Sequence, residues 1–135
     1  MDAGDMRWLA AALAAAGAVA GTVHRRAGDR LVITAAVEIP PPVVAATREI
    51  PRGKGMAGLA WLRGAPVTTC DLQSDTSGDV RPGAKAVGAG QAVAVPVFGD
   101  DGALRAVVGF AFAESGEPDA ARIAALAAAA ATLAG

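Results

Sequence analysis

The stretch "QAVAVPVFGDDGALRAVVGFAFA", residues 91–113, decides the fold. In its first half Val93, Val95 and Val97 alternate with other residues, and apolar residues recur at the same spacing in its second half. The segment GDDG, residues 99–102, separates the two runs. Two alternating runs joined by a short turn of Asp and Gly are typical of an antiparallel hairpin. We therefore expect a sheet of antiparallel strands.

The remaining periodicities predict a helix at each end of the chain and further strands between them. Apolar residues recur at helical spacing in 5–16 and 117–133, and residues alternate as in strands over 18–25 and 30–37. The middle of the chain has weaker patterns. There we expect a break at the prolines 40–42, a helical turn and a short strand in 43–50, a helix at 55–62, a strand at 65–70, and a long excursion at 71–90 with a helical turn near 84–87. This order predicts one α+β domain, residues 1–135, around an antiparallel sheet of five to six strands.

Composition and charge limit the classes of partner that the protein can have. The chain has 135 residues, of which 53% are hydrophobic, so a packed core is expected. Its net charge is -1, so we expect no positive electrostatic field that would attract nucleic acid. The apolar runs near both termini are too short to span a bilayer. The first run also follows Asp2 and Asp5, where a secretory signal would have basic residues. We expect a cytoplasmic protein without nucleic-acid or membrane partners.

The chain has one cysteine, Cys70, and one histidine, His24. An intramolecular disulfide is therefore excluded, and the ligands for a metal site are too few, so no metal or cofactor is expected. Cys70 precedes Asp71, whose carboxylate disfavours a thiolate, and we interpret it as a small residue at a strand end. His24 is expected on a sheet face or edge, with a ligand or pH-sensing role as the alternative.

The stretch RGKGMAG, residues 52–58, spaces its glycines as G-x-G-x-x-G. A dinucleotide site would need a buried parallel strand before this turn and a long helix after it. Instead Pro51 precedes the turn, and the helix has room for only about two turns before Arg63. The glycines therefore let the chain turn sharply into a short helix. Whether they only make this turn stays open, because the first amides of that helix could also receive an anionic group, reinforced by Arg52 and Lys54.

These pieces together resemble the GAF family of ligand-sensing domains. The family pattern joins a Gly-rich turn, a short helix, a strand beginning g-x-p-v with an aspartate after it, and later an a-V-P-v strand paired with a g-v-l/f strand. The matching positions are 53–58, Gly64–Val67, Asp71, Ala94–Val97 and Val108–Phe110. The resemblance spans about residues 5–133. It implies a PAS-related sheet with the terminal helices on one face, and the short helix and long loop on the other.

The resemblance also implies a ligand cavity between the sheet and the 71–90 excursion. The residues expected to contact a ligand are Met56, Trp61, Asp71, Arg81, Gln91, Val93 and Phe110. For three of them an alternative remains. Trp61 could fill the core, and Asp71 could order the start of the loop. Arg81 could be a solvated side chain instead of binding an anionic ligand. Arg105 is expected on a strand face that meets solvent.

A GAF domain implies a sensory module that binds a small molecule and acts through a homodimer of its terminal helices, a signalling partner or a larger chain. Some GAF proteins are free methionine-(R)-sulfoxide reductases, which resemble GKGMAGLAW, residues 53–61, but carry a cysteine there and more in the following loop. Met56 and Ala57 occupy that stretch here. A lone thiol cannot complete an intramolecular disulfide cycle, so we expect no catalysis. The alternative is a dimerisation or scaffold module whose own side chains fill the cavity, and an enzyme of the sulfoxide-reductase type is the third, disfavoured because of the single cysteine.

Overall fold

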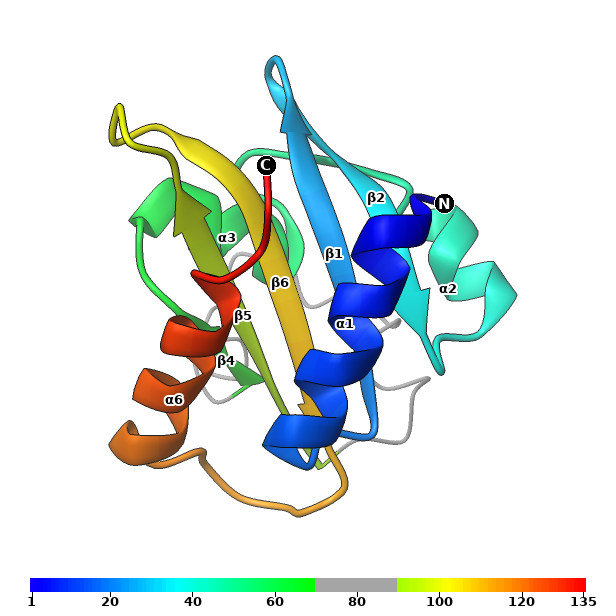
Figure 1. The fold of residues 1–135 in the computed structure, drawn as a ribbon, viewed down its shortest axis with the longest axis vertical. Helices are drawn as coiled ribbons and strands as arrows, with labels where there is room; N and C mark the ends of the chain where they lie inside the picture. Colours follow the sequence, from blue (N-terminus) through cyan, green and yellow to red (C-terminus); the bar gives the residue numbers. More distant parts are fainter. Residues whose placement is uncertain (70–89) are drawn as a thin grey trace.

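The computed structural model describes residues 1–69 and 90–135, and it assembles the alternating runs into one antiparallel sheet. The strands are β1 (Ala20–Ala27), β2 (Arg30–Val37), β3 (Glu49–Pro51), β4 (Val67–Thr68), β5 (Gln91–Phe98) and β6 (Leu104–Phe112). Their order in the sheet is β3-β2-β1-β6-β5-β4, so the first and last strands of the chain are neighbours at its centre (Figure 1). The predicted α+β class is confirmed, and the six strands agree with the five to six that were predicted.

The hairpin predicted from residues 91–113 is formed by β5 and β6. Val95 lies opposite Val108, and the turn is closed by the Gly99 amide, which donates to the Ala103 carbonyl at 2.8 Å. Since successive side chains of a strand point to opposite faces, the valines at 93, 95 and 97 share one face, and Ala92 and Ala94 lie on the other. One hairpin thus contributes to both faces of the sheet.

Helices cover both faces of the sheet. They are α1 (Ala3–Ala16), α2 (Pro41–Ala46), α3 (Gly55–Arg63) and α6 (Ala120–Ala130). Figure 1 shows α1 and α6 side by side over one face, with α3 behind the sheet. Leu9, Leu13 and Leu126 join the valines and phenylalanines of the sheet in the larger core cluster. A smaller cluster under α3 contains Leu59 and Trp61.

Several element boundaries differ from the predicted ones. Helix α6 begins at Ala120 and not near 117, because the carboxylate of Asp119 caps it by accepting from the Arg122 amide at 2.7 Å. Helix α2 begins at Pro41, although we expected the prolines to break regular structure. A proline suits the first turn of a helix, where its missing N–H would have no partner anyway. The predicted excursion lies outside the described residues up to position 89.

A partly buried ion pair connects α1 to the sheet. The Asp5 carboxylate accepts hydrogen bonds from Nε and Nη2 of Arg25, each at 2.8 Å, and from the Thr34 hydroxyl at 2.6 Å. The Arg25 guanidinium holds the pKa of Asp5 below its ordinary value. Because Arg25 lies on β1 and Thr34 on β2, this one carboxylate sets the position of α1 over two strands.

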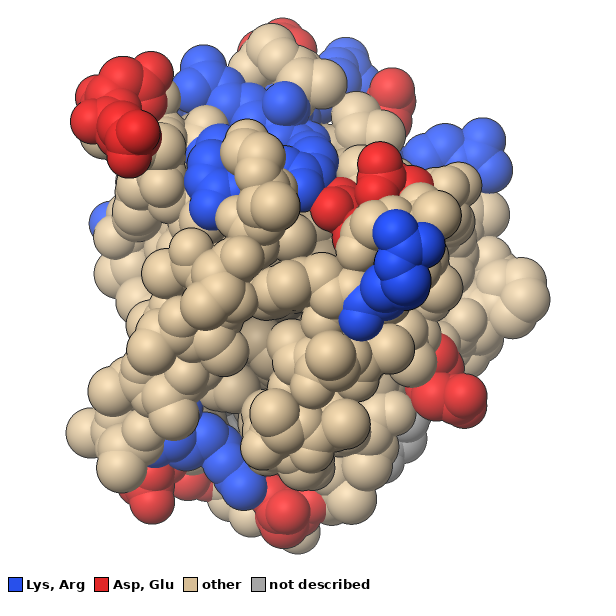
Figure 2. Space-filling view, viewed as in Figure 1, with Lys and Arg blue, Asp and Glu red and all other residues tan. Residues whose placement is uncertain are grey.

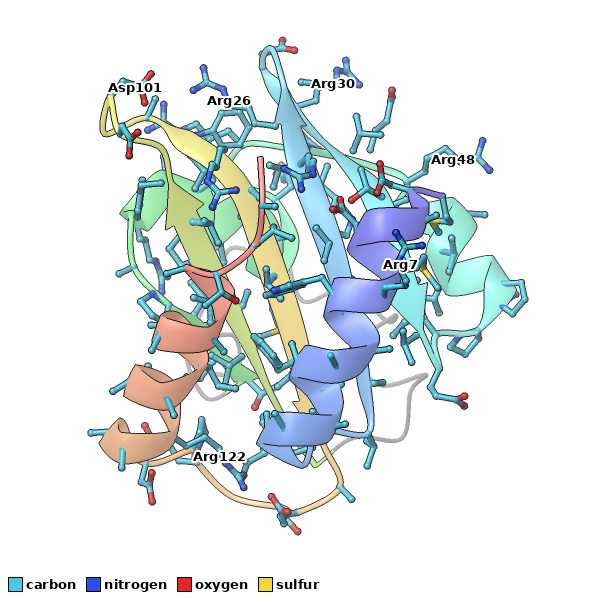
Figure 3. The ribbon with its side chains drawn as sticks, viewed as in Figure 1. Arg7, Arg26, Arg30, Arg48, Asp101 and Arg122 are labelled. Carbon is cyan, nitrogen blue, oxygen red and sulfur yellow. The ribbon has the colours of Figure 1, made fainter. Side chains whose placement is uncertain are left out.

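Charged side chains are sparse on the face that α1 and α6 build. Figure 2 shows this face as mainly uncharged, although Arg7 on α1 lies within it, where Figure 3 labels it. Within residues 1–69 and 90–135, no helix has the length and hydropathy needed to cross a membrane. The same residues contain no group of three or more side chains arranged to hold a metal ion.

Candidate ligand cavity

A cavity of about 160 Å³ lies between the sheet and α3, on the face away from the terminal helices. The strands β1, β5 and β6 form its floor, and α2, β3 and the first turn of α3 form its walls. The lining residues are Gly21, Thr22, His24, Ile39, Val43, Thr47, Ile50, Gly55, Met56, Ala57, Ala92, Val93, Ala94, Val107, Gly109, Phe110 and Ala111. No charged side chain is among these described residues.

Small residues on the cavity side of the sheet explain the open space. Strand β5 presents Ala92 and Ala94 there, and β6 presents Gly109 and Ala111. Gly109 pairs with Thr22 across the strands, and a Cβ at position 109 would lie 2.8 Å from the Thr22 hydroxyl oxygen. Such short side chains cannot reach α3, so this part of the interface stays unfilled.

His24 is the most buried polar side chain in the lining, with 3% of its surface exposed. Its Nε2 lies 2.8 Å from the carbonyl oxygen of Thr47. A carbonyl only accepts, so Nε2 carries a hydrogen and donates it. Burial lowers the pKa of His24, against the opposing effect of the Thr47 hydrogen bond. In the neutral ring Nδ1 therefore carries the lone pair, and this atom is buried and has no hydrogen-bond partner within residues 1–69 and 90–135.

The glycine triplet shapes the wall at α3. Gly53 and Gly55 have φ angles of 87° and 64°, which suit glycine far better than other residues. The Gly53 amide donates to the Gly58 carbonyl at 2.8 Å, and a Cβ at Gly58 would lie 2.6 Å from the Pro51 carbonyl oxygen. The triplet thus folds the chain tightly against the first turn of α3. That turn has no side-chain cap from its N-cap residue Lys54.

Three of the seven predicted contact residues border this cavity. Met56 lines it from α3. Val93 and Phe110 border it too, but both belong to the core cluster formed with α1 and α6. Their side chains therefore point to the opposite face, and the strand alternation leaves mainly their backbone on the cavity side.

The other four lie elsewhere or outside the described residues. Trp61 lines a second, more polar hollow, where the guanidinium carbons of Arg26 and Arg52 lie 5.3 and 5.7 Å from the centre of its ring. Gln91 is buried, donates to the Gly116 carbonyl and accepts from Arg122 at 2.8 Å. Figure 3 shows Arg26 and Arg122 at opposite ends of the molecule. Asp71 and Arg81 lie outside the described residues.

Sequence reasoning missed most of the cavity floor and misplaced one arginine. Thr22, Ala92 and Gly109 were passed over, although small residues two apart on neighbouring strands are a usable sign of an unfilled sheet face. Arg105 was expected to face solvent. Its side chain instead folds onto residue 133, where Nη2 donates to the Leu133 carbonyl, and Nη1 is buried with no partner among the residues that the structure describes.

The comparison with protein families identifies the class. A family model for the GAF domain matches residues 7–135, which is nearly the whole chain. The chain belongs to the GAF domain family, as its sequence pattern predicted. In a comparison with curated proteins, no sequence was similar enough to match.

Solved structures share the fold at low sequence identity. The GAF domain of a phosphoenolpyruvate-protein phosphotransferase from Coxiella burnetii has a TM-score of 0.67 and 18% identity, with 91% of this chain and 77% of that chain covered. A type II free methionine-R-sulfoxide reductase from Thermoplasma acidophilum has a TM-score of 0.70 and 16% identity, covering 93% and 85%. A free methionine-R-sulfoxide reductase from Neisseria meningitidis, solved with its substrate, has a TM-score of 0.66 and 20% identity, with 91% of this chain and 73% of that chain covered.

The last two structures correct one expectation. We expected a domain without catalysis, and that exclusion was wrong, because enzymes are among the proteins with this fold. At 16–20% identity the likeness establishes the fold alone. The architecture is therefore compatible with chemistry as well as with sensing.

Proposed function

We propose that this GAF domain binds a small, mainly apolar molecule in the cavity between the sheet and α3. The observation that carries the proposal is the cavity itself, about 160 Å³ in volume and lined by small and apolar residues. An apolar cavity of about 150 Å³ can accept a molecule of the size of benzene, so the volume here suffices for one small ring. Ligand sites are typically concave and apolar, with few polar groups that orient the ligand.

The contact set that we propose combines predicted residues with residues that only the structure brings together. Its members are Thr22, His24, Thr47, Met56, Val93, Phe110 and the alanines of β5. The cavity wall includes the first turn of α3 and part of α2, so an occupant would stabilise the packing of both helices on the sheet. This coupling is a physical route by which ligand binding could alter a surface that a partner recognises.

Toluene is a suitable probe for the cavity, since it is apolar and close to the expected size. We expect toluene to raise the melting temperature of the wild-type protein, because a ligand that binds only the folded state stabilises it. Ala92→Leu, which places a larger side chain into the cavity, should abolish this rise. Ala113→Leu is the matched control, since Ala113 is exposed and absent from the lining.

The outcome is decided by comparing the two leucine variants by thermal melting and by titration calorimetry. Retained toluene binding in Ala113→Leu together with its loss in folded Ala92→Leu would support the cavity. Equal binding by both variants, or no binding by the wild type, would contradict the proposal.

A second candidate is reduction of a sulfoxide, which we propose because reductases of free methionine-R-sulfoxide share the fold. Cys70 is the only thiol of the chain, so turnover would require an external thiol to resolve the oxidised cysteine. The test is consumption of free methionine-(R)-sulfoxide with dithiothreitol as the reductant. Activity that disappears in Cys70→Ser would support this candidate, and no consumption by the wild type would exclude it.

A further inference from the structure

A second hollow lies at the far end of α3 from the apolar cavity, around the ring of Trp61. Its volume is about 380 Å³, and it shares no lining residue with that cavity. The last residues of α3 form one wall, and β1, the turn before α3 and the β5–β6 hairpin form the others. The lining residues are Arg26, Arg52, Trp61, Leu62, Arg63, Gly64, Phe98, Gly102, Ala103 and Leu104. The second hollow is therefore separate from the site of the proposed function.

Three positive charges gather in the second hollow. Arg26, Arg52 and Arg63 all belong to its lining, and no acidic residue does. None of the three arginines forms an ion pair with a residue in the ranges 1–69 and 90–135. Positive charges that lie near one another repel, and this repulsion is not balanced by a carboxylate in the described part of the chain. An anion bound in the hollow would supply the missing negative charge.

Two neighbouring arginines of β1 show the difference between the faces of the sheet. Arg25 and Arg26 are adjacent, so their side chains point to opposite faces. On the face of α1, the Asp5 carboxylate binds Arg25. On the face of α3, Arg26 donates from Nε to the Gly28 carbonyl at 2.9 Å. Its two Nη groups have no hydrogen-bond partner among the described residues, so they keep their donors for a ligand.

Acidic residues at this end of the molecule are engaged elsewhere. Figure 3 shows Asp101 at the same end as Arg26. The Asp101 carboxylate accepts from a backbone amide of its own turn at 3.0 Å. Asp29 and Glu49 both pair with Arg30, at 3.8 and 3.5 Å. None of these carboxylates lines the second hollow, so its positive charge is not cancelled from within.

The second hollow also offers apolar contacts beside the arginines. The guanidinium carbons of Arg26 and Arg52 lie 5.3 and 5.7 Å from the centre of the Trp61 ring. An arginine that packs on an aromatic ring still presents N–H donors suited to a carboxylate or a phosphate. Leu62 and Phe98 belong to the same lining and are 54% and 44% exposed. A ligand that combines a negative charge with an apolar group would use both kinds of contact.

We propose that the second hollow binds a small organic anion, such as an aryl phosphate or an aryl carboxylate. Its charged group contacts Arg26 and Arg52, since guanidinium groups bind such anions through paired hydrogen bonds. Its ring lies against Phe98 and Leu62. The volume of about 380 Å³ falls within the range of about 300–1,000 Å³ that is typical of small-molecule sites. This ligand binds independently of any occupant of the apolar cavity, because the two linings have no residue in common.

Phenyl phosphate is the probe, and titration calorimetry compares its binding to the wild type, Arg52→Gln and Arg7→Gln. Both arginines are exposed, and each variant loses one positive charge. Arg7 is the matched control, because it lies on α1, on the other side of the sheet (Figure 3). We expect Arg52→Gln to weaken binding about tenfold, since it loses a hydrogen bond to a charged group, and Arg7→Gln to leave binding nearly unchanged. Added salt should weaken binding to the wild type, because it screens exposed charges.

The second measurement reports on Trp61 directly. The chain has 2 tryptophans, so Trp8→Phe leaves Trp61 as the only indole. Phenyl phosphate should change the fluorescence of Trp61 in this variant with the same Kd that calorimetry gives for the wild type. Inorganic phosphate, which has no ring, should bind more weakly. Ala92→Leu, which fills the apolar cavity, should not alter the binding of phenyl phosphate.

The outcomes separate this inference from the proposed function, which the toluene experiment decides. Failure of the wild type to bind phenyl phosphate, or equal binding by Arg52→Gln and Arg7→Gln, would overturn the inference and leave the apolar cavity unaffected. Loss of binding in Ala92→Leu would place phenyl phosphate in the apolar cavity and overturn it as well. Inorganic phosphate that binds as tightly as phenyl phosphate would contradict the apolar contacts. A phosphotyrosine peptide that binds much more tightly than phenyl phosphate would assign the hollow to a partner protein instead of a small molecule.

Discussion

Gly58 shows how a motif typical of one function serves another purpose at the scale of a residue. The spacing G-x-G-x-x-G is typical of dinucleotide-binding turns, but here the third glycine lets α3 approach the chain just before it. A Cβ at this position would lie 2.6 Å from the Pro51 carbonyl oxygen and 3.1 Å from the Gly53 nitrogen. Both are backbone atoms, which cannot move aside as a flexible side chain can.

Gly58→Ala therefore tests packing against helix propensity. Alanine in a helix is about 1 kcal/mol better than glycine by propensity. We expect the clash to outweigh this gain, with a net loss of about 2 kcal/mol in the free energy of unfolding measured in urea. The control is Ala125→Gly on the exposed side of α6, which measures the effect of helix propensity without a change in packing. A Gly58→Ala protein as stable as the wild type would show that the turn relaxes without penalty.

At the scale of elements, the Asp5 carboxylate connects α1 to two strands. The side chain of Asp5 is 7% exposed and that of Arg25 28% exposed, so solvent screens this pair only in part. The Asp5 carboxylate binds two nitrogens of Arg25 on β1 and the hydroxyl of Thr34 on β2. The sequence of α1 alone gives no sign of either contact. This contact explains why an alanine-rich helix with little apolar area takes one position on the sheet.

Asp5→Asn should lower the free energy of unfolding by about 2 kcal/mol at pH 7. The loss is smaller than for a fully buried pair, because the Arg25 side chain is partly exposed to solvent. The pKa of Asp5 is lower in the folded state, so the unfolded state takes up the proton first as the pH falls. The stability from the pair is thus present above about pH 4 and is lost below it. The measurement is urea unfolding at pH 7 and at pH 3, with Glu117→Gln as the exposed control. The difference in the free energy of unfolding between the wild type and Asp5→Asn should be smaller at pH 3 than at pH 7. An unchanged difference would assign the loss to packing.

At the scale of the whole molecule, the terminal helices leave an outer face with few charged side chains, of which Arg7 on α1 is one. Ala124 and Ala131 are exposed on or just beyond α6, whereas Ala127 packs partly against the core. Helices with such small side chains can approach one another closely. A homodimer through this face, proposed first from the sequence, remains a prediction, as do a signalling partner and a cytoplasmic location.

Analytical ultracentrifugation over a range of protein concentrations tests the dimer. We expect the wild type to dimerise as its concentration rises and the double variant Ala124→Arg, Ala128→Arg to stay monomeric. The melting temperature of the variant should be nearly that of the monomeric wild type. These alanines are exposed, so the arginines should leave the core intact. A wild-type protein that stays monomeric throughout would rule out this interface.

The sequence predicted the fold well and the site only in part. The alternation in residues 91–113 placed a hairpin correctly, because strand periodicity is a local property of the chain. The same alternation could not say which face of that hairpin would be filled. Val93 and Phe110 were thus assigned to a ligand although their side chains meet the terminal helices. Trp61 was assigned to the same site, but Arg26 and Arg52 hold its ring in another hollow.

By itself, the sequence determined the order of helices and strands, the GAF pattern and the tight glycine turn, since each depends on neighbours along the chain. Only the tertiary structure decided where the cavity lies and that His24 belongs to its lining. A cavity is the space that side chains from β1, β5, β6, α2 and α3 fail to fill, and their distances across the sheet exist only after folding. The hydrogen on Nε2 of His24 is likewise fixed by Thr47, a residue that folding brings next to it.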